Sequence, residues 1–271
     1  MIPEPGQWLR PDTGDTPSHP ALMAEMAAAP VVLLGERHDR ADNHRWQMQV
    51  AAGLLAHRER LVLGFEMFPA RLDPVLAEWV AGRLDEAAFL ERAEWGTVWG
   101  FPPELYLPLF HFCRLHRVPM IGLNCRRDLV REVGAGGWDS VPEEAREGLT
   151  PAAPASPAYR RYLFEVTGGP RPDRAAKDPD DPAFDRFVRA QQTWDRAFAC
   201  RIVDARARDP GALVVGIIGR GHLEYRGGTP AQLADLGIPE ARVLLPWEGA
   251  RPVPAGIGCA VFGLQEAAGQ A

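Results

Sequence analysis

The chain has 271 residues, of which 46% are hydrophobic and 24% are charged, a composition typical of an ordinary globular protein. Its net charge of −6 at pH 7 argues against non-specific attraction to nucleic acid or anionic lipid, so neither is expected as a partner. Lys177 is the only lysine, which argues against a Schiff-base mechanism. The cysteines form no Cys-x-x-Cys pair, which excludes zinc-ribbon, thioredoxin-type and c-type haem sites.

The amino-terminal residues do not resemble a targeting segment. The first twenty residues are rich in proline and have no apolar core, so they do not form a signal peptide. No apolar run approaches the ~18–20 residues that span a bilayer, and no transmembrane segment is expected. We expect a cytoplasmic protein if this amino terminus is the native one, and a periplasmic protein or cell-surface lipoprotein if a signal was removed.

Four stretches share one design, in which an apolar run leads into a polar or ionisable side chain. They cover residues 31–39, 61–66, 118–124 and 213–222. Buried parallel strands have this pattern because both of their faces are covered. Residues between them show helical periodicity, and the longest predicted helix runs from Phe184 to about Arg208. The sequence therefore predicts an α/β fold with a mainly parallel central sheet flanked by helices.

The domain organisation is predicted to be simple. We expect a single domain over residues 1–271, in which residues 242–247 and 258–264 add two further strands at the sheet edge. Gly, Ala and Pro become dense in residues 134–182, and the predicted helices there are short. We interpret that segment as a helical insertion or mobile lid within the domain.

The ends of these strands predict a functional rim. Parallel strands bring their carboxyl ends to one edge, where open α/β sheets bind ligands. Glu36 and His38 lie two residues apart, so in an extended backbone their side chains point to the same side. With Glu66 and His222 they would form a cluster of two carboxylates and two imidazoles. For any one of these residues alone, a helix cap or a solvated strand end is the alternative interpretation.

This cluster suits two kinds of chemistry. Two carboxylates and two imidazoles can bind Zn²⁺, Mn²⁺ or Co²⁺ with one position open for water. The metal would lower the pKa of that water and generate a nucleophile for hydrolysis. Without metal, a carboxylate that orients an imidazole can serve general acid–base catalysis.

Arg126 and Arg127 follow the third predicted strand, directly after the Asn124–Cys125 pair. Their guanidinium groups can clamp a carboxylate or phosphate, or they can pair with Glu36 or Glu66 and keep those carboxylates ionised. Both interpretations stay open. The first allows a third function, non-catalytic binding of a small anionic ligand by these arginines and helix amino termini.

Tyr225 lies three residues after His222 and should sit just above the rim. Phenolate is one of the known axial ligands of haem iron, although a loop tyrosine is more often an amphipathic surface residue. Residues 219–222 lack the third glycine and the lysine of a phosphate-binding loop, so we expect no nucleotide site. No serine sits on a strand-to-helix elbow, which argues against a Ser-His-Asp triad.

Five ordered motifs resemble those of the ChaN-like family of haem-binding uptake proteins. The resemblance extends from Trp8 to about Leu264. Erythromycin esterases, TraB proteins and Tiki metalloproteases belong to the same wider superfamily and share two Gly-x-x-His motifs, here Gly35 to His38 and Gly219 to His222. The five motifs are Gly35-Glu36-Arg37-His38-Asp39 with Asn43-His44-Arg45, Phe65-Glu66-Met67-Phe68, Asn124 with Arg127, Phe187-Val188 with Ala190-Gln191 and Trp194-Asp195, and Gly219-Arg220-Gly221-His222.

This resemblance implies haem binding in bacterial iron or haem uptake. Tyr225 would be the axial ligand, and dimerisation would be a means of covering the haem. Propionate or outer-shell partners would be His222, Asn124, Arg126 and Arg127. The superfamily also implies an alternative, a metal-dependent hydrolase that uses Glu36, His38, Glu66 and His222, and whether the chain is an enzyme stays open.

Overall fold

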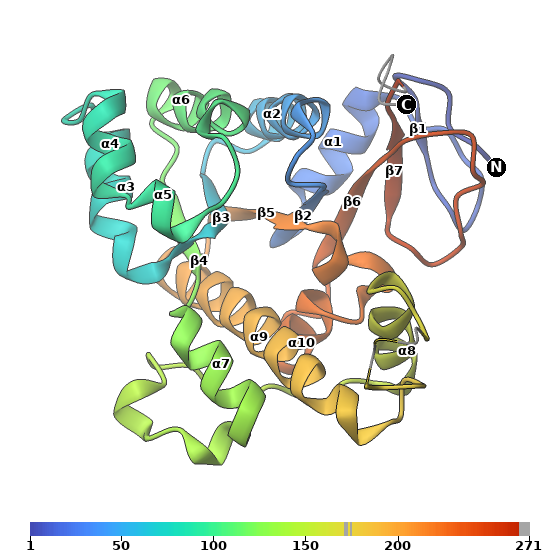
Figure 1. Cartoon of the computed structure of the whole chain (residues 1–271). Helices are drawn as coiled ribbons and strands as arrows, with labels where there is room; N and C mark the ends of the chain where they lie inside the picture. Colours follow the sequence, from blue (N-terminus) through green and yellow to red (C-terminus); the bar gives the residue numbers. More distant parts are fainter. Residues whose placement is uncertain (171–172, 174, 266–271) are drawn as a thin grey trace.

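A mainly parallel sheet forms the centre of the protein (Figure 1). The computed structural model describes residues 1–170, 173 and 175–265. Within these residues the sheet has seven strands, and only β1 and β7 pair in antiparallel orientation. The prediction of an α/β fold is confirmed. The strand order is β1 (Trp8–Leu9), β7 (Ala260–Gly263), β6 (Arg242–Trp247), β2 (Val31–Glu36), β5 (Leu213–Gly219), β3 (Leu61–Pro69) and β4 (Met120–Asn124).

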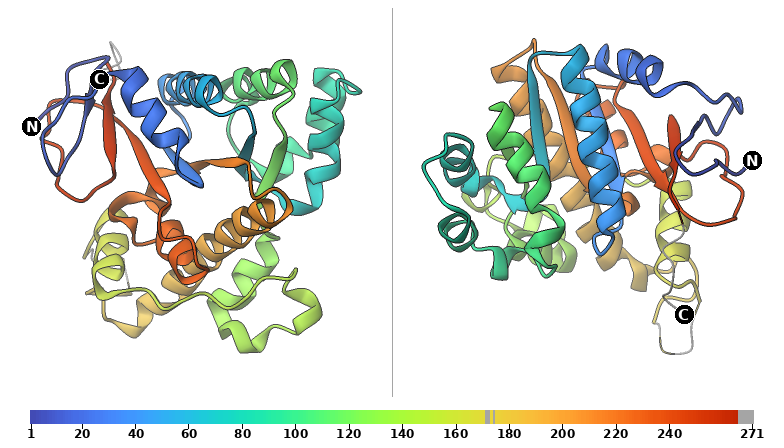
Figure 2. Two further views of the ribbon diagram at one scale, coloured as in Figure 1. Left: turned by 180° about the vertical axis from the view of Figure 1, so that it is seen from behind. Right: turned by 90° about the horizontal axis from the view of Figure 1, so that it is seen from above.

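Helices cover both faces of the sheet (Figures 1 and 2). In the described part of the chain, no helix is both long and apolar enough to cross a bilayer. One layer contains α1 (His19–Ala27), α2 (Ala41–His57), α3 (Asp73–Val80), α4 (Glu86–Arg92), α5 (Trp95–Val98) and α6 (Leu107–His116). The opposite layer contains α7 (Arg127–Gly136), α9 (Asp185–Arg208) and α10 (Thr229–Asp235), with α8 (Pro157–Val166) beside it.

Central strand β2 shows why the sheet is buried on both faces. All six of its residues are buried. Val32 and Leu34 pack into the core beneath α1, α2 and α6, whereas Val31 and Leu33 pack into the core beneath α7, α9 and α10. This alternation follows from the two-residue period of a strand. The strand is therefore fixed in the middle of the molecule, and Glu36 is delivered at its carboxyl end.

The structure corrects the predicted position of the last two strands. We expected them at the sheet edge, but β6 lies between β7 and β2, and β7 lies between β1 and β6. The edges are β1 and β4. Strand β1 has only two residues, too few to show a periodic pattern, and its Trp8 pairs with Phe262 of β7.

The predicted insertion, residues 134–182, begins inside the last turn of α7 and contains α8. Helix α8 contributes Tyr159, Leu163 and Phe164 to a small core. This core also includes Phe184, which directly precedes α9, and Val188, which lies on α9. Residues 171, 172 and 174 of the segment lie outside the described residues. That the segment moves as a lid stays a prediction.

Candidate functional site

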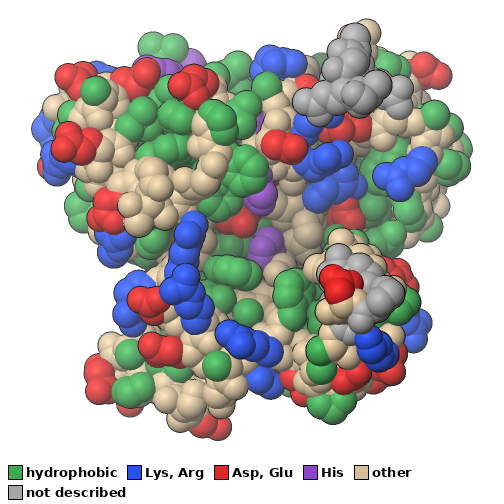
Figure 3. Space-filling view, in the orientation of Figure 1, with side chains coloured by type: hydrophobic (Ala, Val, Ile, Leu, Met, Phe, Trp, Pro, Cys, Tyr) green, Lys and Arg blue, Asp and Glu red, His purple; other side chains and the backbone are tan. Residues whose placement is uncertain are grey.

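The carboxyl ends of β2, β3 and β5 meet at one rim, as the sequence predicts. A cleft of about 470 Å³ opens there between Glu36 and His38 on one side and Gln191 and His222 on the other. Figure 3 shows histidine side chains in the hollow at the middle of this face. We call it the histidine cleft. His222 comes from the short 3₁₀ turn Arg220–His222 that directly follows β5.

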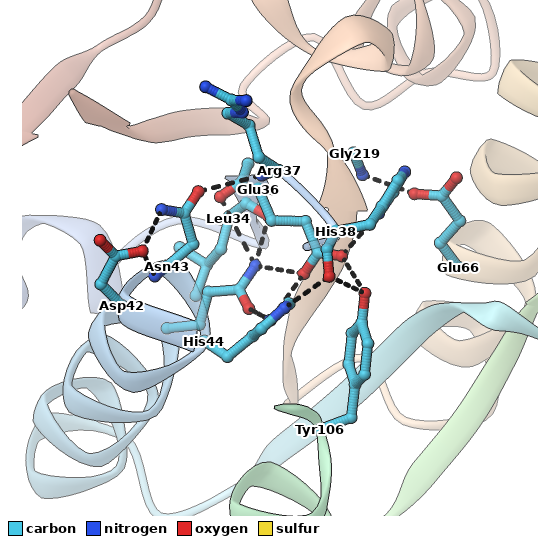
Figure 4. A network of polar contacts seen from close by, with 12 residues as sticks. Leu34, Glu36, Arg37, His38, Asp42, Asn43, His44, Glu66, Tyr106 and Gly219 are labelled. Atoms are coloured by element: carbon cyan, nitrogen blue, oxygen red, sulfur yellow. Dashed lines mark hydrogen bonds and ion pairs between the residues drawn. The ribbon is translucent and has the colours of Figure 1, made fainter. Parts of the chain in front are cut away.

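Glu36 is the hub of a buried hydrogen-bond network (Figure 4). Only 2% of the residue is exposed. Its Oε1 accepts a hydrogen bond from the Tyr106 hydroxyl at 2.8 Å and lies 2.8 Å from His38 Nδ1. Its Oε2 accepts from Gln47 Nε2 at 2.9 Å and lies 3.3 Å from His44 Nδ1. Both carboxylate oxygens are therefore fully engaged by the protein.

This network controls the ionisation of Glu36. Burial alone would raise its pKa, but hydrogen bonds and positive charge from His38 and His44 outweigh burial and lower the pKa to about 2. The two imidazoles respond in the opposite sense. Burial alone would lower their pKa values, but contact with Glu36 raises both. The carboxylate and the imidazoles thus stabilise each other's charged forms.

His38 is held against an aromatic wall. Its ring lies edge-to-face on Trp99, with centroids 4.9 Å apart, and 5.3 Å from the ring of Phe101. The ring also lies close to Gly219, where an added Cβ would lie 3.0 Å from His38 Nε2 and 3.3 Å from Glu66 Oε2. Only glycine leaves room there, so Gly219 allows the imidazole and the second carboxylate to approach each other.

His222 has a carboxylate partner that the sequence analysis did not assign. Its Nδ1 lies 2.8 Å from Oδ1 of Asp195, which is fully buried on α9. The Asp195 carboxylate also accepts hydrogen bonds from the hydroxyls of Tyr159, at 2.7 Å, and Thr229, at 3.0 Å. Burial alone would lower the pKa of His222, but Asp195 and then Glu66 raise it. The result is a second imidazole–carboxylate pair.

Glu66 links the two pairs. Its Oε2 accepts a hydrogen bond from the backbone amide of Gly219, and its Oε1 lies 3.7 Å from His222 Nε2. The four residues predicted as a cluster, Glu36, His38, Glu66 and His222, are therefore brought together by the fold. His44 and Asp195 were quoted within the family motifs but were given no role at the site by the sequence analysis, and Gln47 and Tyr106 were not named there.

The structure does not support the predicted divalent metal site. Among the described residues, no group of three His, Cys, Asp or Glu side chains is arranged to hold a metal ion. The physical reason is that both oxygens of Glu36 are already engaged by protein groups, and Oε2 of Glu66 accepts a hydrogen bond from the amide of Gly219. What remains are two imidazole–carboxylate pairs that face one cleft.

Arg126, Arg127 and Asn124 have structural partners elsewhere. Arg126 Nε donates to Glu147 at 2.7 Å, and Arg127 Nη2 donates to the carbonyl of Val98 at 2.8 Å. The interpretation that these arginines pair with Glu36 or Glu66 is wrong, because Arg126 pairs with a loop carboxylate and Arg127 with a backbone carbonyl. Asn124 Nδ2 donates to the backbone carbonyl of Glu66 at 2.8 Å and so supports the site from behind.

Tyr225 lines a second cleft, of about 540 Å³, which we call the tyrosine cleft. The residue is 44% exposed, and its backbone is left-handed, with φ at 56°. Such a conformation is strained for a non-glycine residue. Its ring meets Tyr162 of α8 edge-to-face at 5.5 Å. Arg220 and Gly221 line both clefts, so the two are neighbours.

These observations define a class, an α/β protein with two histidine-containing motifs at the carboxyl edge of its sheet. Residues 22–233 match the model of the family described as haem-binding uptake, Tiki superfamily, ChaN. The chain belongs to this family, which confirms the resemblance found in its motifs. No curated protein matches the sequence.

Solved structures share the fold. ChaN of Campylobacter jejuni, described with cofacial haem binding, has a TM-score of 0.74 and 17% identity over 94% of this chain and 95% of that one. The type III effector HopBA1 has a TM-score of 0.51 and 13% identity, over 96% of this chain and 97% of the effector. The erythromycin esterase EreC in its open conformation has a TM-score of 0.51 and 13% identity, over 89% of this chain and 77% of the esterase. At these identities the similarity shows the fold alone.

The Glu36 network predicts a stability maximum at mildly acidic pH. Because the pKa of Glu36 is lowered from 4.5, its contribution is present above pH 4.5 and is lost as the pH falls towards 2. Because the pKa values of His38 and His44 are raised from 6.5, their contribution is present below pH 6.5 and is lost as the pH rises beyond it. Urea denaturation should therefore give the largest free energy of unfolding between these values.

Glu36→Gln should lower the free energy of unfolding by about 3 kcal/mol near pH 5.5, because it breaks a buried ion pair, and should flatten both limbs of the profile. Glu86→Gln is the matched control. Glu86 pairs with His111 at 3.1 Å on the surface, where each side chain is 51% exposed, and its loss should cost less than about 1 kcal/mol. Equal effects of the two substitutions would contradict the role given to Glu36.

Proposed function

We propose that this protein binds haem in the tyrosine cleft, with the Tyr225 phenolate as the axial ligand of the iron. The observation that carries the proposal is the state of the Tyr225 hydroxyl. The other three tyrosines of the chain donate theirs to carboxylates: Tyr106 to Glu36, Tyr159 to Asp195 and Tyr162 to Glu224. Tyr225 makes no hydrogen bond through its hydroxyl to any described residue and is exposed at a cleft.

The walls of the tyrosine cleft fit the rest of a haem. Val166, Trp247 and Ile257 offer apolar surface to a flat macrocycle, and two prolines, Pro252 and Pro254, add to it. The cleft also has five charged side chains in its lining, and a combination of apolar surface with fixed polar groups is typical of cofactor sites. If haem were bound here, it would supply the iron that the Tyr225 phenolate could ligate. Membership of the haem-binding uptake family supports the proposal.

The strained turn that carries Tyr225 supports its role as a ligand. Its amide donates to the carbonyl of Ile257 at 3.1 Å, which ties the turn to the loop before β7. Burial, and next Glu224, raise the pKa of the Tyr225 hydroxyl, and Arg220 opposes them. Ligation as phenolate therefore releases a proton, and haem affinity should increase as the pH rises.

A haemin titration of the purified protein, followed by visible absorbance, tests this assignment. Wild type should give a saturable, shifted Soret band at near-stoichiometric haemin. Tyr225→Phe should lose that spectrum and bind at least about tenfold more weakly, a loss typical even of the outer partners of metal ligands. Tyr162→Phe is the control, because it removes the hydroxyl of another tyrosine in the same cleft. That hydroxyl already donates to Glu224. If both variants keep the wild-type spectrum, Tyr225 is not the ligand.

We propose further that haem binding serves iron or haem uptake and brings two copies of the chain together. Val166 is 55% exposed and Tyr225 is 44% exposed, so a haem laid on them has one uncovered face. The related Campylobacter jejuni protein is described with cofacial haem binding. Light scattering should show the mass doubling with haemin in wild type but not in Tyr225→Phe. An unchanged mass at saturating haemin would contradict the dimer.

A second candidate function is metal-free hydrolysis in the histidine cleft. The favouring observation is that His38 and His222 each have Nδ1 against a carboxylate and line one cleft. This arrangement leaves Nε2 as the nitrogen that can move a proton, as in general base activation of water.

Hydrolysis of a p-nitrophenyl ester tests this second function. His222→Ala should lower kcat by about 100-fold, because it removes the general base, and Tyr225→Phe should leave kcat unchanged. His111→Ala is the control, since that histidine pairs with Glu86 on the surface, away from the cleft. Equal rates of the His222→Ala and His111→Ala proteins would exclude catalysis by this cleft.

A further inference from the structure

Arg220 occupies the boundary between the two clefts and lines both of them. Its guanidinium lies over the ring of Trp247, 5.5 Å from the centroid, and its Nε donates to Oε1 of Glu224. Neither terminal nitrogen donates to any described residue, although the side chain is only 25% exposed. A half-buried guanidinium thus presents an unused pair of donors to a ligand cleft.

Glu224 holds this guanidinium in place. The glutamate is 7% exposed, and its second oxygen accepts a hydrogen bond from the Tyr162 hydroxyl at 2.8 Å. It therefore holds both Arg220 and Tyr162, and the ring of Tyr162 packs against Tyr225. A buried carboxylate with both oxygens satisfied allows little rotation of its partners. The donors of Arg220 are consequently preorganised before any ligand arrives.

A guanidinium with two free donor nitrogens favours one kind of ligand group. The planar fork matches the two oxygens of a carboxylate, with which it forms parallel charge-assisted hydrogen bonds. Arg251 lines the same cleft and adds a second positive charge. Two acidic groups also line the cleft beside Glu224. Glu248 is compensated by Arg40, at 3.5 Å, and Arg37, at 3.8 Å, whereas Glu165 is exposed to water.

We propose that Arg220 binds a carboxylate of the porphyrin ligand, with Glu224 as its positioning residue, so that the tyrosine cleft recognises porphyrin dicarboxylates whether or not they contain iron. This inference rests on the proposed function of the tyrosine cleft. It separates two contributions to the binding free energy, because Tyr225 ligates the iron and Arg220 binds the carboxylate.

The proposal replaces the sequence-based assignment of Arg126 and Arg127 as propionate partners. Arg126 resembles Arg220 closely, because its Nε also donates to a glutamate, Glu147. Its Nη2, however, donates to the carbonyl of Ala145, and Arg126 lines neither cleft. Arg126→Gln is therefore a matched control for Arg220→Gln.

The test uses iron-free protoporphyrin and its dimethyl ester, with binding to the full chain measured by porphyrin fluorescence. Wild type should bind the dicarboxylate about tenfold more tightly than the diester, the value of one charge-assisted hydrogen-bond pair. Arg220→Gln should lose this preference and leave the affinity for the diester unchanged. Arg220→Lys should keep part of the preference, and Arg126→Gln should keep all of it.

Two results would overturn the proposal. One is an equal affinity of wild type for the dicarboxylate and the diester. This comparison uses wild type alone, so it is decisive even if Arg220→Gln does not fold. The other is an equal weakening of both ligands by Arg220→Gln, which would show a purely structural role. If haemin still gives the Tyr225-dependent spectrum, only the carboxylate assignment fails. If neither haemin nor protoporphyrin binds, the proposed function fails with it.

Discussion

The buried carboxylate of Glu36 is the constraint on which the rim of the sheet depends. A charge at the end of a central strand is tolerated only because donors surround it. His38 comes from the same strand end, Gln47 from α2, and Tyr106 from the start of α6. The network therefore ties one helical layer to the edge of the sheet. It also sets the orientation of the imidazole that forms one wall of the histidine cleft.

Strand ends could be predicted from the sequence, but their partners could not. Glu36, Glu66 and His222 follow apolar runs, and the strand pattern places them at one edge. Asp195 belongs to a helix, and its neighbours in space are distant in the chain. A usable signal was present nonetheless, since Gln191 and Asp195 occupy the buried face of α9 together with Val188, Phe198 and Ile202. A polar residue in an apolar stripe marks a side chain with a specific partner.

The arginines illustrate the opposite limit. Which carboxylate a guanidinium meets depends on the path of loops, and local pattern does not encode that path. Arg126 is bound by Glu147 of a loop, whereas Arg220 is bound one helical turn away by Glu224. Helix α8, from the predicted insertion, supplies Tyr159 beneath the histidine cleft and Tyr162 at the tyrosine cleft. The segment is thus a shared support for both.

The turn at Tyr225 has a thermodynamic consequence. Tyr225 and Arg226 both have left-handed backbones, with φ of 56° and 59°, and a glycine at either position would adopt this shape without strain. Side chains there restrict the unfolded chain more than glycine would. The strain of the left-handed backbone costs more than this restriction gains, so the turn is ordered at the expense of folding stability. A ligand that contacts the Tyr225 ring meets a surface already in place, and little of its binding free energy is consumed by loss of loop entropy.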